Sequence, residues 1–332
     1  MPDQAPARVS VALGTHNGRR YLGEQLESIL RQTSPVDEIV LSDDASVDDT
    51  VALARTILDA HRATSDAPTP ELVVLRNPVA LGVTANFEQA LRAASGDVIA
   101  LCDQDDVWHP DRVAKALAAF ASRPELDLVA AEARLVDDEG EPIGSSLFET
   151  LGVDDRLRGR LASDAAFGEL LRRNVLTGAT MMVSRSLVER AAPFPPSWVH
   201  DEWLAMVASV GRGIAIVAEP LIDYRQHGGN QIGVTRLGAG GKVARLREPR
   251  TERNARLLAR AEDLAERLPV IAPAPGVEAA VRAKLDHELM RQGLASQRLR
   301  RVVPVWREWR SGAYDRFGRG AQDVLRDLVQ PV

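Results

Sequence analysis

Three aspartates lie within four positions at the end of an apolar run, in the segment IALCDQDDVWHP at 99–110. Clustered carboxylates repel one another, and burying them is costly unless a cation offsets their charge. Asp103, Asp105 and Asp106 offer hard oxygen ligands that suit Mg²⁺ or Mn²⁺, with water and phosphate oxygens completing the shell. Capping of the helix expected at 111–123 is the alternative role for this acidic cluster, but capping accounts for Asp111 better than for Asp103, Asp105 and Asp106. The pattern therefore predicts a divalent cation site.

The elements that would position these aspartates alternate between short apolar runs and segments with helical spacing of apolar residues. The expected strands are 9–13, 38–43, 71–77, 97–103 and 127–136, and the expected helices are 21–32, 48–63, 83–95 and 111–123. Strands that alternate with helices are typical of a parallel sheet with helical crossovers. We therefore expect an α/β fold with a mostly parallel central sheet flanked by helices.

Polar clusters follow three of the expected strands: GTHNG at 14–18, SDDAS at 42–46 and the aspartates after the fourth strand. In open α/β sheets, ligands bind beyond the carboxyl ends of the strands. Either of the first two clusters alone could be an ordinary turn or the cap of the next helix. Their shared position predicts one binding site at that edge of the sheet.

The second part of the chain has a mixed pattern. A helix is expected at 196–211, and its opening turn contains Asp201 and Glu202. From about residue 241 the chain is rich in arginine and helical in pattern. We therefore expect a main domain over 1–240 and a helical C-terminal extension over 241–332.

The composition is that of an ordinary globular protein, with 332 residues of which 45% are hydrophobic. The net charge of −6 excludes an overall basic field, so we expect no nucleic-acid partner. The single cysteine, Cys102, excludes an internal disulfide framework and a cysteine-based zinc site. Because the sequence shows neither a signal-peptide pattern nor an apolar run approaching about 20 residues, a cytoplasmic location is expected.

The C-terminal segment RLRRVVPVWREWRSGAYDRFGRG at 298–320 places Trp306, Trp309, Tyr314 and Phe317 among many arginines. This pattern is typical of an interfacial helix that binds anionic lipid, which would put the protein at the inner face of a membrane. An amphipathic helix packed on its own domain would show the same pattern. The sequence leaves both interpretations open, and it leaves open whether the protein is a homodimer.

Four segments stand in a characteristic order: VSVALGTHNGRRYLGEQLESILRQT, DEIVLSDDASVDDT, GDVIALCDQDDVWHPDRV and HDEWLAMVAS. In this order and spacing they resemble glycosyltransferase family 2 over about residues 8–235. The resemblance implies the Rossmann-like GT-A fold, with 1–240 binding a nucleotide diphosphate sugar and catalysing its transfer. The segment YRQHGGNQIG at 224–233 is similar to the bacterial rhamnosyltransferase branch, which favours dTDP-rhamnose as donor over a UDP-sugar.

The resemblance also implies roles for individual residues. Those expected to bind the donor are Thr15, His16, Asn17, Asp43, Asp44, Asn86, Asp103 and Gln104. Asp44 would accept a hydrogen bond from the base, with Asp43 in support. Asp103 and Asp105 match the family's DxD motif and would hold Mg²⁺ or Mn²⁺ against the two phosphates. Asp106 is an additional or alternative ligand.

A late histidine, His227, sits where many GT-A enzymes place a histidine near the metal. An ordinary histidine in a polar loop explains His227 equally well. Asp201, in the HDEW turn, matches the acidic residue that serves as catalytic base. Glu202 is the rival base, and helix capping is the other role open to Asp201.

The expected chemistry needs this set of residues. Negative charge develops on the leaving diphosphate, where a dication stabilises it, and the acceptor hydroxyl must lose a proton to a positioned carboxylate. One base and no carboxylate nucleophile imply a single displacement with inversion. The processive synthases' Gln-x-x-Arg-Trp motif is not found, which favours transfer of a single sugar.

We therefore expect an inverting, metal-dependent glycosyltransferase. Its acceptor would be a glycan, a lipid-linked molecule or a small molecule, in cell-surface polysaccharide, glycolipid or natural-product glycosylation. A nucleotidyltransferase is one alternative, although GTHNGRR is a poor match for its phosphate loop. A non-catalytic protein that binds nucleotide sugars is the other, and the intact set of acids argues against it.

Overall fold

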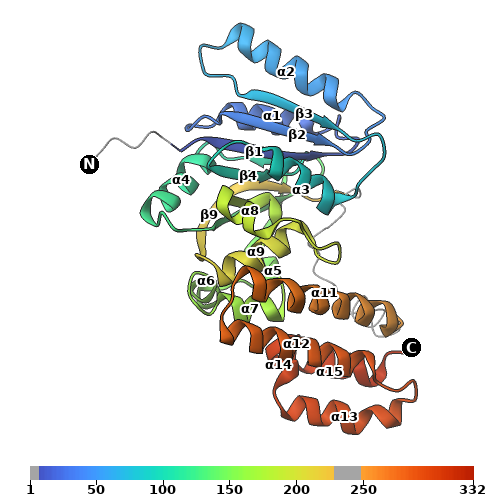
Figure 1. The fold of residues 1–332 in the computed structure, drawn as a ribbon. Coiled ribbons are helices and arrows are strands. Elements are labelled where there is room, and N and C mark those ends of the chain that lie inside the picture. Colours follow the sequence, from blue (N-terminus) through green and yellow to red (C-terminus); the bar gives the residue numbers. More distant parts are fainter. Residues whose placement is uncertain (1–6, 228–247) are drawn as a thin grey trace.

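The computed structural model describes residues 7–227 and 248–332. Within them, nine strands form one sheet in the order β3-β2-β1-β4-β8-β6-β9-β5, with β7 beside β6. Helices cover the sheet, and the C-terminal helices form a separate layer at the end of the molecule remote from α2 (Figure 1). The predicted α/β fold with a helical C-terminal part is confirmed.

The strands of the sheet are β1 (Val9–Thr15), β2 (Glu38–Asp43), β3 (Glu71–Arg76), β4 (Val98–Cys102), β5 (Val107–Trp108), β6 (Leu128–Val136), β7 (Pro142–Ser146), β8 (Met181–Ser184) and β9 (Ile214–Arg225). The helices before residue 228 are α1 (Leu22–Leu30), α2 (Thr50–Thr64), α3 (Val83–Ala93), α4 (Arg112–Ser122), α5 (Leu147–Leu151), α6 (Asp155–Leu161), α7 (Ala166–Arg172), α8 (Arg185–Ala191) and α9 (His200–Val210). A 3₁₀ turn, η1 (Gly178–Thr180), precedes β8. The helices after residue 247 are α11 (Arg250–Ile271), α12 (Pro275–Gln292), α13 (Arg298–Arg310), α14 (Ala313–Phe317) and α15 (Ala321–Val329).

The strand β1 determines where the site lies. It pairs in parallel with β2 on one side and with β4 on the other, so the chain winds outward from β1 in both directions. Every residue of β2 and of β4 is buried, as expected for parallel strands covered on both faces. A switch in winding direction leaves a crevice at the carboxyl ends of the two strands that flank it. The polar clusters predicted from the sequence open into this crevice.

The other half of the sheet is mixed in direction. The strand β8 pairs antiparallel with both β4 and β6, whereas β6 and β9 run parallel. This half brings the end of β9 and the start of α9 toward the carboxyl end of β4. It therefore closes the crevice on the side away from β2.

The C-terminal helices pack on the rest of the protein. Leu264 and Leu268 of α11 and Phe317 of α14 belong to the same apolar cluster as Trp203 and Leu204 of α9. The predicted domain boundary at residue 240 lies outside the described residues and stays a prediction. Over 7–227 and 248–332, no helix combines the length and apolarity needed to cross a bilayer.

The helix α13 has its apolar side chains on two faces. One face packs inward and buries Arg301 and Val305. The outward face exposes large apolar side chains, which are Leu299, Val302, Val303, Trp306 and Trp309. Tyr314 and Phe317, in contrast, are buried in α14. Packing on the protein's own domain therefore explains Tyr314 and Phe317 but not the two tryptophans.

Candidate active site

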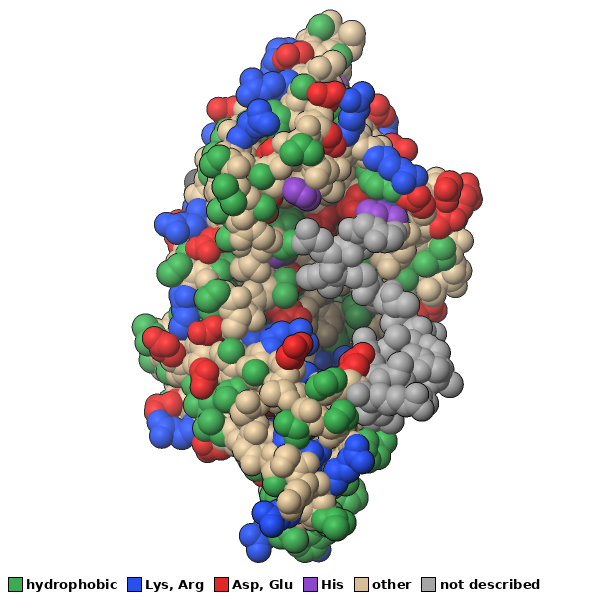
Figure 2. Space-filling model, turned by 90° about the vertical axis from the view of Figure 1, so that its right-hand side faces the viewer, with side chains coloured by type: hydrophobic (Ala, Val, Ile, Leu, Met, Phe, Trp, Pro, Cys, Tyr) green, Lys and Arg blue, Asp and Glu red, His purple; other side chains and the backbone are tan. Residues whose placement is uncertain are grey.

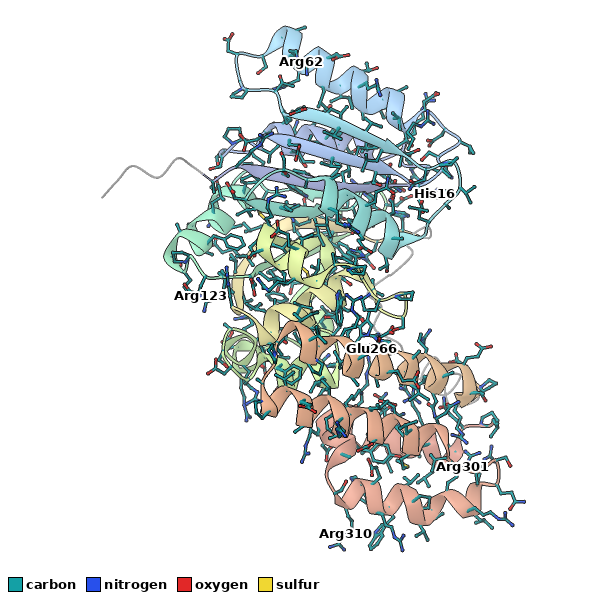
Figure 3. The ribbon with its side chains drawn as sticks, viewed as in Figure 1. His16, Arg62, Arg123, Glu266, Arg301 and Arg310 are labelled. Carbon is teal, nitrogen blue, oxygen red and sulfur yellow. The ribbon has the colours of Figure 1, made fainter. Side chains whose placement is uncertain are left out.

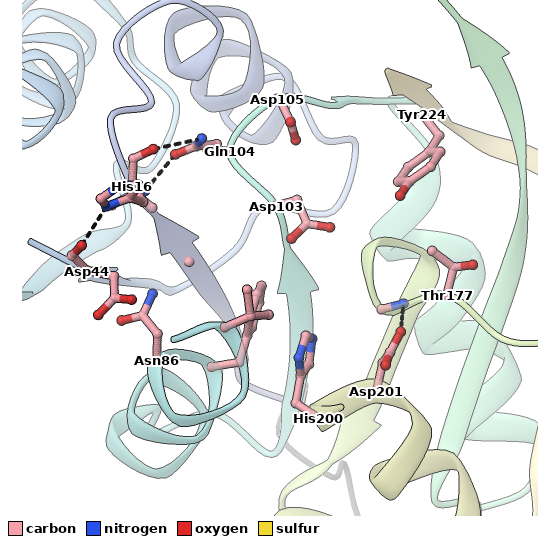
Figure 4. Close-up of a pocket in the computed structure, with 15 residues that line it drawn as sticks. His16, Asp44, Asn86, Asp103, Gln104, Asp105, Thr177, His200, Asp201 and Tyr224 are labelled. Atoms are coloured by element: carbon pink, nitrogen blue, oxygen red, sulfur yellow. Dashed lines mark hydrogen bonds between the residues drawn. The ribbon is translucent and has the colours of Figure 1, made fainter. Parts of the chain in front are cut away.

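A cavity lies at the carboxyl ends of β1 and β4 (Figure 4). Its lining residues are Gly14, Thr15, His16, Asp44, Val83, Asn86, Phe87, Asp103, Gln104, Asp105, Thr177, Gly178, His200, Asp201 and Tyr224. The clusters after the first, second and fourth predicted strands thus meet in one place, as predicted. The start of α9 and the end of β9 complete the wall.

Gln104 joins the loop after β4 to the loop after β1. Its side-chain oxygen accepts from the His16 backbone N–H at 2.9 Å, and its side-chain nitrogen donates to the His16 carbonyl at 3.2 Å. A Cβ at Gly18 would collide with the Gln104 side chain, so glycine makes this bridge possible. The His16 ring nitrogen Nδ1 lies 2.6 Å from the Asp44 carbonyl oxygen, which only accepts, so Nδ1 carries a proton.

Asp44 shapes the part of the cavity expected to hold the base. Its carboxylate accepts from the backbone N–H groups of Leu81 at 2.6 Å and Gly82 at 2.9 Å. Oδ2 takes only the Gly82 bond among the described residues, so it retains room for one more donor. Asp43 is fully buried and accepts from the Thr15 hydroxyl at 3.0 Å. Its support of Asp44 stays a prediction.

The two predicted asparagines differ in position. Asn86 lines the cavity and also fixes α3 against β2, because it accepts from the Ser42 hydroxyl at 2.7 Å and donates to the Ser42 carbonyl at 2.9 Å. Asn17 does not line the cavity, contrary to the prediction. It adopts a positive φ of 49°, a turn conformation that asparagine tolerates, and its side chain accepts from the Val47 N–H at 2.9 Å.

The side chains of the three aspartates at the end of β4 do not all face the cavity. Asp103 and Asp105 line the cavity, and Asp106 does not. Asp106 is 2% exposed, and its Oδ1 accepts from the Arg225 backbone N–H at 3.0 Å. Its Oδ2 has no hydrogen-bond partner among the described residues. In this arrangement the backbone of β9 holds one oxygen of Asp106, and the carboxylate does not line the cavity. That Asp106 is an additional or alternative ligand stays a prediction.

His227 lies beside Asp105. Its Nε2 is 2.8 Å from Asp105 Oδ2, and its ring stacks on Tyr21 with the centroids 4.8 Å apart. The predicted neighbourhood of His227 and the DxD carboxylates is therefore present in the fold. Whether the imidazole binds a metal itself stays a prediction.

The carboxyl groups on the cavity wall lie close enough together for their charges to shift the pKa of a neighbour. Burial, followed by the charges of Asp105 and Asp201, raises the pKa of Asp103 to about 7. Beneath them Arg112 is fully buried and donates to the Ala179 carbonyl at 2.7 Å. Burial lowers the pKa of Arg112 to about 10, and its charge offsets only part of the negative charge above it. The acids thus retain excess negative charge at the cavity wall.

The donor set fits a hard dication that takes most of its ligands from elsewhere. In the part of the chain that the structure describes, no three His, Cys, Asp or Glu side chains are arranged as a complete metal site. Mg²⁺ and Mn²⁺ bind through one or two carboxylates together with waters and substrate phosphates, so two carboxylates on a cavity wall suit them. The same set does not suit zinc, which prefers nitrogen and sulfur ligands.

Asp201 is the second residue of α9 and lies on the cavity wall. Its Oδ2 accepts from the Gly178 backbone N–H at 2.9 Å and its Oδ1 from the Glu202 backbone N–H at 2.7 Å. Val199, not Asp201, is the N-cap residue of α9, so capping does not account for this carboxylate. Burial raises the pKa of Asp201 above its ordinary value, and the backbone hydrogen bonds oppose that shift only in part.

Glu202 points away from this cavity. Its carboxylate pairs with the Arg260 guanidinium of α11, and it does not line the cavity. Of the two acids in the HDEW turn, only Asp201 can reach a ligand bound against Asp103 and Asp105.

Comparison with known proteins places this fold and site in a family. The model of the family described as glycosyl transferase family 2 matches residues 10–190, more than half of the chain. The chain belongs to glycosyl transferase family 2. The matched region contains β1 and β4 with the polar clusters that follow them, and it ends before Asp201.

Curated relatives of this family 2 protein are distant. The uncharacterized protein Rv1520 of Mycobacterium tuberculosis is 29% identical over 66% of this chain and 59% of its own length. The uncharacterized glycosyltransferase alr2836 of Nostoc is 26% identical over 67% of this chain and 66% of its own. The chain thus spans about 59% of the length of the first relatives that it matches.

Two solved structures share the fold. S. aureus TarS in complex with UDP-GlcNAc is 17% identical, with a TM-score of 0.55 over 96% of this chain and 90% of TarS. The mannosyltransferase PcManGT from Pyrobaculum calidifontis, in complex with GDP-Man and Mn²⁺, is 18% identical, with a TM-score of 0.53 over 98% of this chain and 86% of PcManGT. At this level of identity the likeness concerns the fold.

The cavity residues of this family 2 protein that were not predicted from the sequence include Thr177, Gly178, His200 and Tyr224, together with the apolar Val83 and Phe87. His200 stacks on Phe87 with centroids 4.0 Å apart, and burial lowers its pKa to about 3, so the ring is neutral. Its position next to Asp201 in HDEW was the one available signal. Tyr224 is buried at the end of β9, and nothing local in the sequence distinguishes it from a core tyrosine.

Proposed function

We propose that this family 2 protein is an inverting, metal-dependent glycosyltransferase that moves one sugar from a nucleoside diphosphate sugar to an acceptor hydroxyl. The observation that carries the proposal is that Asp201 lies on the same cavity wall as Asp103 and Asp105, although these residues come from different elements (Figure 4). An acid pair for a metal and a separate carboxylate for proton removal are what such a transfer requires.

The donor would lie with its base between Thr15, His16 and Asp44. Uracil and thymine both present an N3–H donor, which Asp44 Oδ2 would accept, so UDP- and dTDP-sugars are both suitable. The dTDP-rhamnose preference remains our first choice on the sequence of residues 224–233. The complexes of TarS with UDP-GlcNAc and of PcManGT with GDP-Man and Mn²⁺ support a nucleotide-sugar donor and a divalent metal.

Asp103 and Asp105 would hold Mg²⁺ or Mn²⁺, with His227 beside Asp105. When bound, such a cation supplies positive charge that stabilises the leaving diphosphate. The protein's own contribution is to aim the two carboxylates into the cavity. Arg112, buried beneath them, limits the repulsion between these carboxylates while the cation is absent.

Asp201 would remove the proton from the acceptor hydroxyl. The Gly178 and Glu202 N–H groups hold its carboxylate in place, and burial makes that carboxylate a stronger base than an exposed aspartate. Glu202 is paired with Arg260, so Asp201 is the acid of the HDEW turn that faces the donor cavity. If Asp103 and Asp105 hold the metal, Asp201 is the one remaining carboxylate at the junction of the two cavities that could take the proton, and the transfer would proceed by one displacement with inversion.

The test is turnover of dTDP-rhamnose, UDP-glucose, UDP-GlcNAc and GDP-mannose, each with and without Mn²⁺. We expect hydrolysis or transfer with one donor class, dependent on Mn²⁺, and a loss of about 10²–10⁴-fold in transfer for Asp201→Asn. Asp105→Asn should remove the increase in activity that Mn²⁺ gives to the wild type. Asp66→Asn, in an exposed loop, should have no effect. Release of pyrophosphate from a nucleoside triphosphate and a sugar 1-phosphate would favour a nucleotidyltransferase. Donor binding without any turnover would favour the non-catalytic alternative.

We also propose that the outward face of α13 rests on an anionic membrane surface. This face, formed by Leu299, Val302, Val303, Trp306 and Trp309, is apolar, and the exposed arginines beside it are Arg298, Arg300, Arg307 and Arg310. The one acid of the helix, Glu308, is bonded to His287 at 2.6 Å and does not oppose them. Arg310 lies at the lower edge of the molecule, remote from the sheet (Figure 3). Apolar side chains flanked by arginines complement anionic lipid.

A further inference from the structure

A second cavity adjoins the donor cavity at the catalytic base. It has a volume of about 710 Å³ and shares Thr177, Asp201 and Tyr224 with the first cavity. Asp103 and Asp105 line the first cavity only, so a molecule bound in this groove would reach Asp201 without entering the space beside these two acids. This is the position from which an acceptor hydroxyl would approach.

The walls of this groove come from two distant parts of the chain. One wall is the segment that follows α7, and the other is the turn between α14 and α15. The turn is held by hydrogen bonds from the N–H groups of Gly318 and Gly320 to the Tyr314 carbonyl, at 3.1 and 3.0 Å. Gly320 adopts a positive φ of 59°, which this turn requires. The C-terminal helices are therefore part of the groove rather than a separate appendage.

Three arginines line the groove: Arg172, Arg173 and Arg319. Arg319 is exposed, and over the described residues its side chain forms no ion pair or hydrogen bond. Arg173 donates to the Leu151 carbonyl at 2.6 Å and forms no ion pair within the described residues, although the charge of Glu169 offsets part of its own. Arg172 has a carboxylate partner, Glu169, at 3.4 Å.

The arginines lie close enough to repel one another. Burial, followed by the charges of Arg319 and Arg172, lowers the pKa of Arg173. Glu169 offsets part of this repulsion. Like charges held together are unfavourable, and an anionic ligand would relieve what remains. The groove is therefore prepared for negative charge.

Two of the three acids that line the groove have partners of their own. Glu202 is paired with Arg260, and Asp201 is bonded to backbone N–H groups. Asp315 is exposed, and within the described part of the chain it forms no ion pair with an arginine of the groove. Figure 2 shows acidic side chains at the upper end of the hollow on this side of the molecule and basic side chains at its lower end.

We propose that this groove binds the acceptor, and that Arg173 and Arg319 recognise a phosphoryl group that the acceptor carries near the reacting hydroxyl. The guanidinium fork matches phosphate oxygens, and a dianion suits a groove lined by Arg172, Arg173 and Arg319 better than a neutral sugar does. The inference rests on the proposed function, because it names the class of acceptor whose hydroxyl Asp201 would deprotonate.

The test uses glycerol 3-phosphate as the probe and glycerol as its neutral counterpart. Calorimetric titration is carried out on the full chain saturated with Mn²⁺ and the nucleoside diphosphate that the donor screen identifies, so that the diphosphate site is filled. We expect saturable binding of glycerol 3-phosphate only, weakened roughly tenfold by Arg319→Gln and by Arg173→Gln. Arg316→Gln, on α14 but outside the groove, is the matched control and should bind like the wild type.

Equal affinity of the wild type and Arg319→Gln would overturn the inference, and so would equal affinity for glycerol or no saturable binding at millimolar concentration. Arg319 is exposed, so its variant should fold, and its melting temperature checks this. Donor hydrolysis separates the two proposals. If the wild type hydrolyses no donor, the proposed function fails. If hydrolysis persists unchanged and the arginine variants bind the probe normally, only the acceptor assignment fails.

Discussion

The carboxylate of Asp201 accepts a hydrogen bond of 2.9 Å from the backbone N–H of Gly178, and residue 178 has little room for a side chain. A Cβ there would lie 3.1 Å from His200 Nε2 and 3.2 Å from Asp201 Cβ. The glycine therefore allows the N–H to approach the base closely. This pair joins the loop before β8 to the first turn of α9, at the point where the two cavities meet.

Gly178→Ala should lower the rate of transfer more than it lowers donor affinity. The added methyl would shift Asp201 by a few tenths of an ångström or more, and such a misplacement of a base costs roughly 10- to 100-fold in kcat. Steady-state kinetics and donor binding measured on the same variant would check this. Gly168→Ala, where the added methyl meets nothing within 4 Å, should leave kcat unchanged. An unchanged kcat in Gly178→Ala would mean that Asp201 is not the base.

The rate should rise with pH because Asp201 acts only when ionised. Burial raises its pKa above 3.8, whereas the charge of Arg260 lowers it. Arg260→Gln should therefore move the acidic limb of the kcat profile to higher pH and leave the plateau in place. Arg256→Gln, exposed on the same helix, should not move it. A shift of the limb toward lower pH in Arg260→Gln would contradict the assignment.

Glu38 should make the fold sensitive to acid. Burial alone would raise its pKa, but hydrogen bonds from the Ser10 hydroxyl at 2.5 Å and from the N–H and hydroxyl of Ser95 hold the pKa below 4.5. A depressed pKa stabilises the folded state fully above pH 4.5, and this stabilisation is lost as the pH falls through the folded-state value. Glu38→Gln should lower the free energy of unfolding by about 1–3 kcal/mol at pH 7.

Urea denaturation of the Glu38 variant at pH 7 and at pH 3 checks both statements. The difference from the wild type should shrink at the lower pH, since Glu38 is then closer to neutral and the glutamine is neutral at both pH values. Glu71→Gln, in the opposing and exposed position of β3, is the control and should change little at either pH. A difference that stays constant with pH would contradict the role given to the Glu38 charge.

The membrane proposal predicts that the protein binds vesicles of phosphatidylglycerol and not of phosphatidylcholine. Trp306 and Trp309 are 51% and 49% exposed, whereas Trp108, Trp198 and Trp203 are buried, so a blue shift of tryptophan fluorescence on binding would come from α13. The variant Trp306→Ala with Trp309→Ala should lose at least tenfold in vesicle affinity. Leu325→Ala, exposed on α15, should not. A dimer that forms without vesicles and is abolished by the tryptophan variant would assign the face to a second copy.

The parallel half of the sheet was predictable because its strands are apolar runs bounded by polar turns, and such runs carry a local signal. The short strand β5 was missed because two residues have no periodicity, and its pairing with β9 depends on residues more than a hundred positions away. The mixed directions of β8 and β9 were missed for the same reason. Crossovers fix the direction of neighbouring strands only where the connections are regular.

The site was predictable where position along a strand determined it. Thr15, Asp44 and Asp103 follow parallel strands, so their meeting in one crevice followed from the fold class. The direction of the Asp106 side chain could not be predicted, because spacing does not tell which way a side chain turns after a strand ends, and here the backbone N–H of Arg225 holds it. The groove arginines could not have been paired from sequence at all, because Arg173 and Arg319 meet only through the packing of the C-terminal helices.

The shared core of α9 and the C-terminal helices bears on how this protein could be engineered. Leu264, Leu268 and Phe317 pack in one cluster with Trp203 and Leu204, which follow the base by only a few residues. A chimera that takes these helices from a relative would have to take the contacting face of α9 with them. We expect α9 and the C-terminal helices to have diverged together. A change in acceptor preference would then require changes in both parts and could not be obtained by exchanging the helices alone.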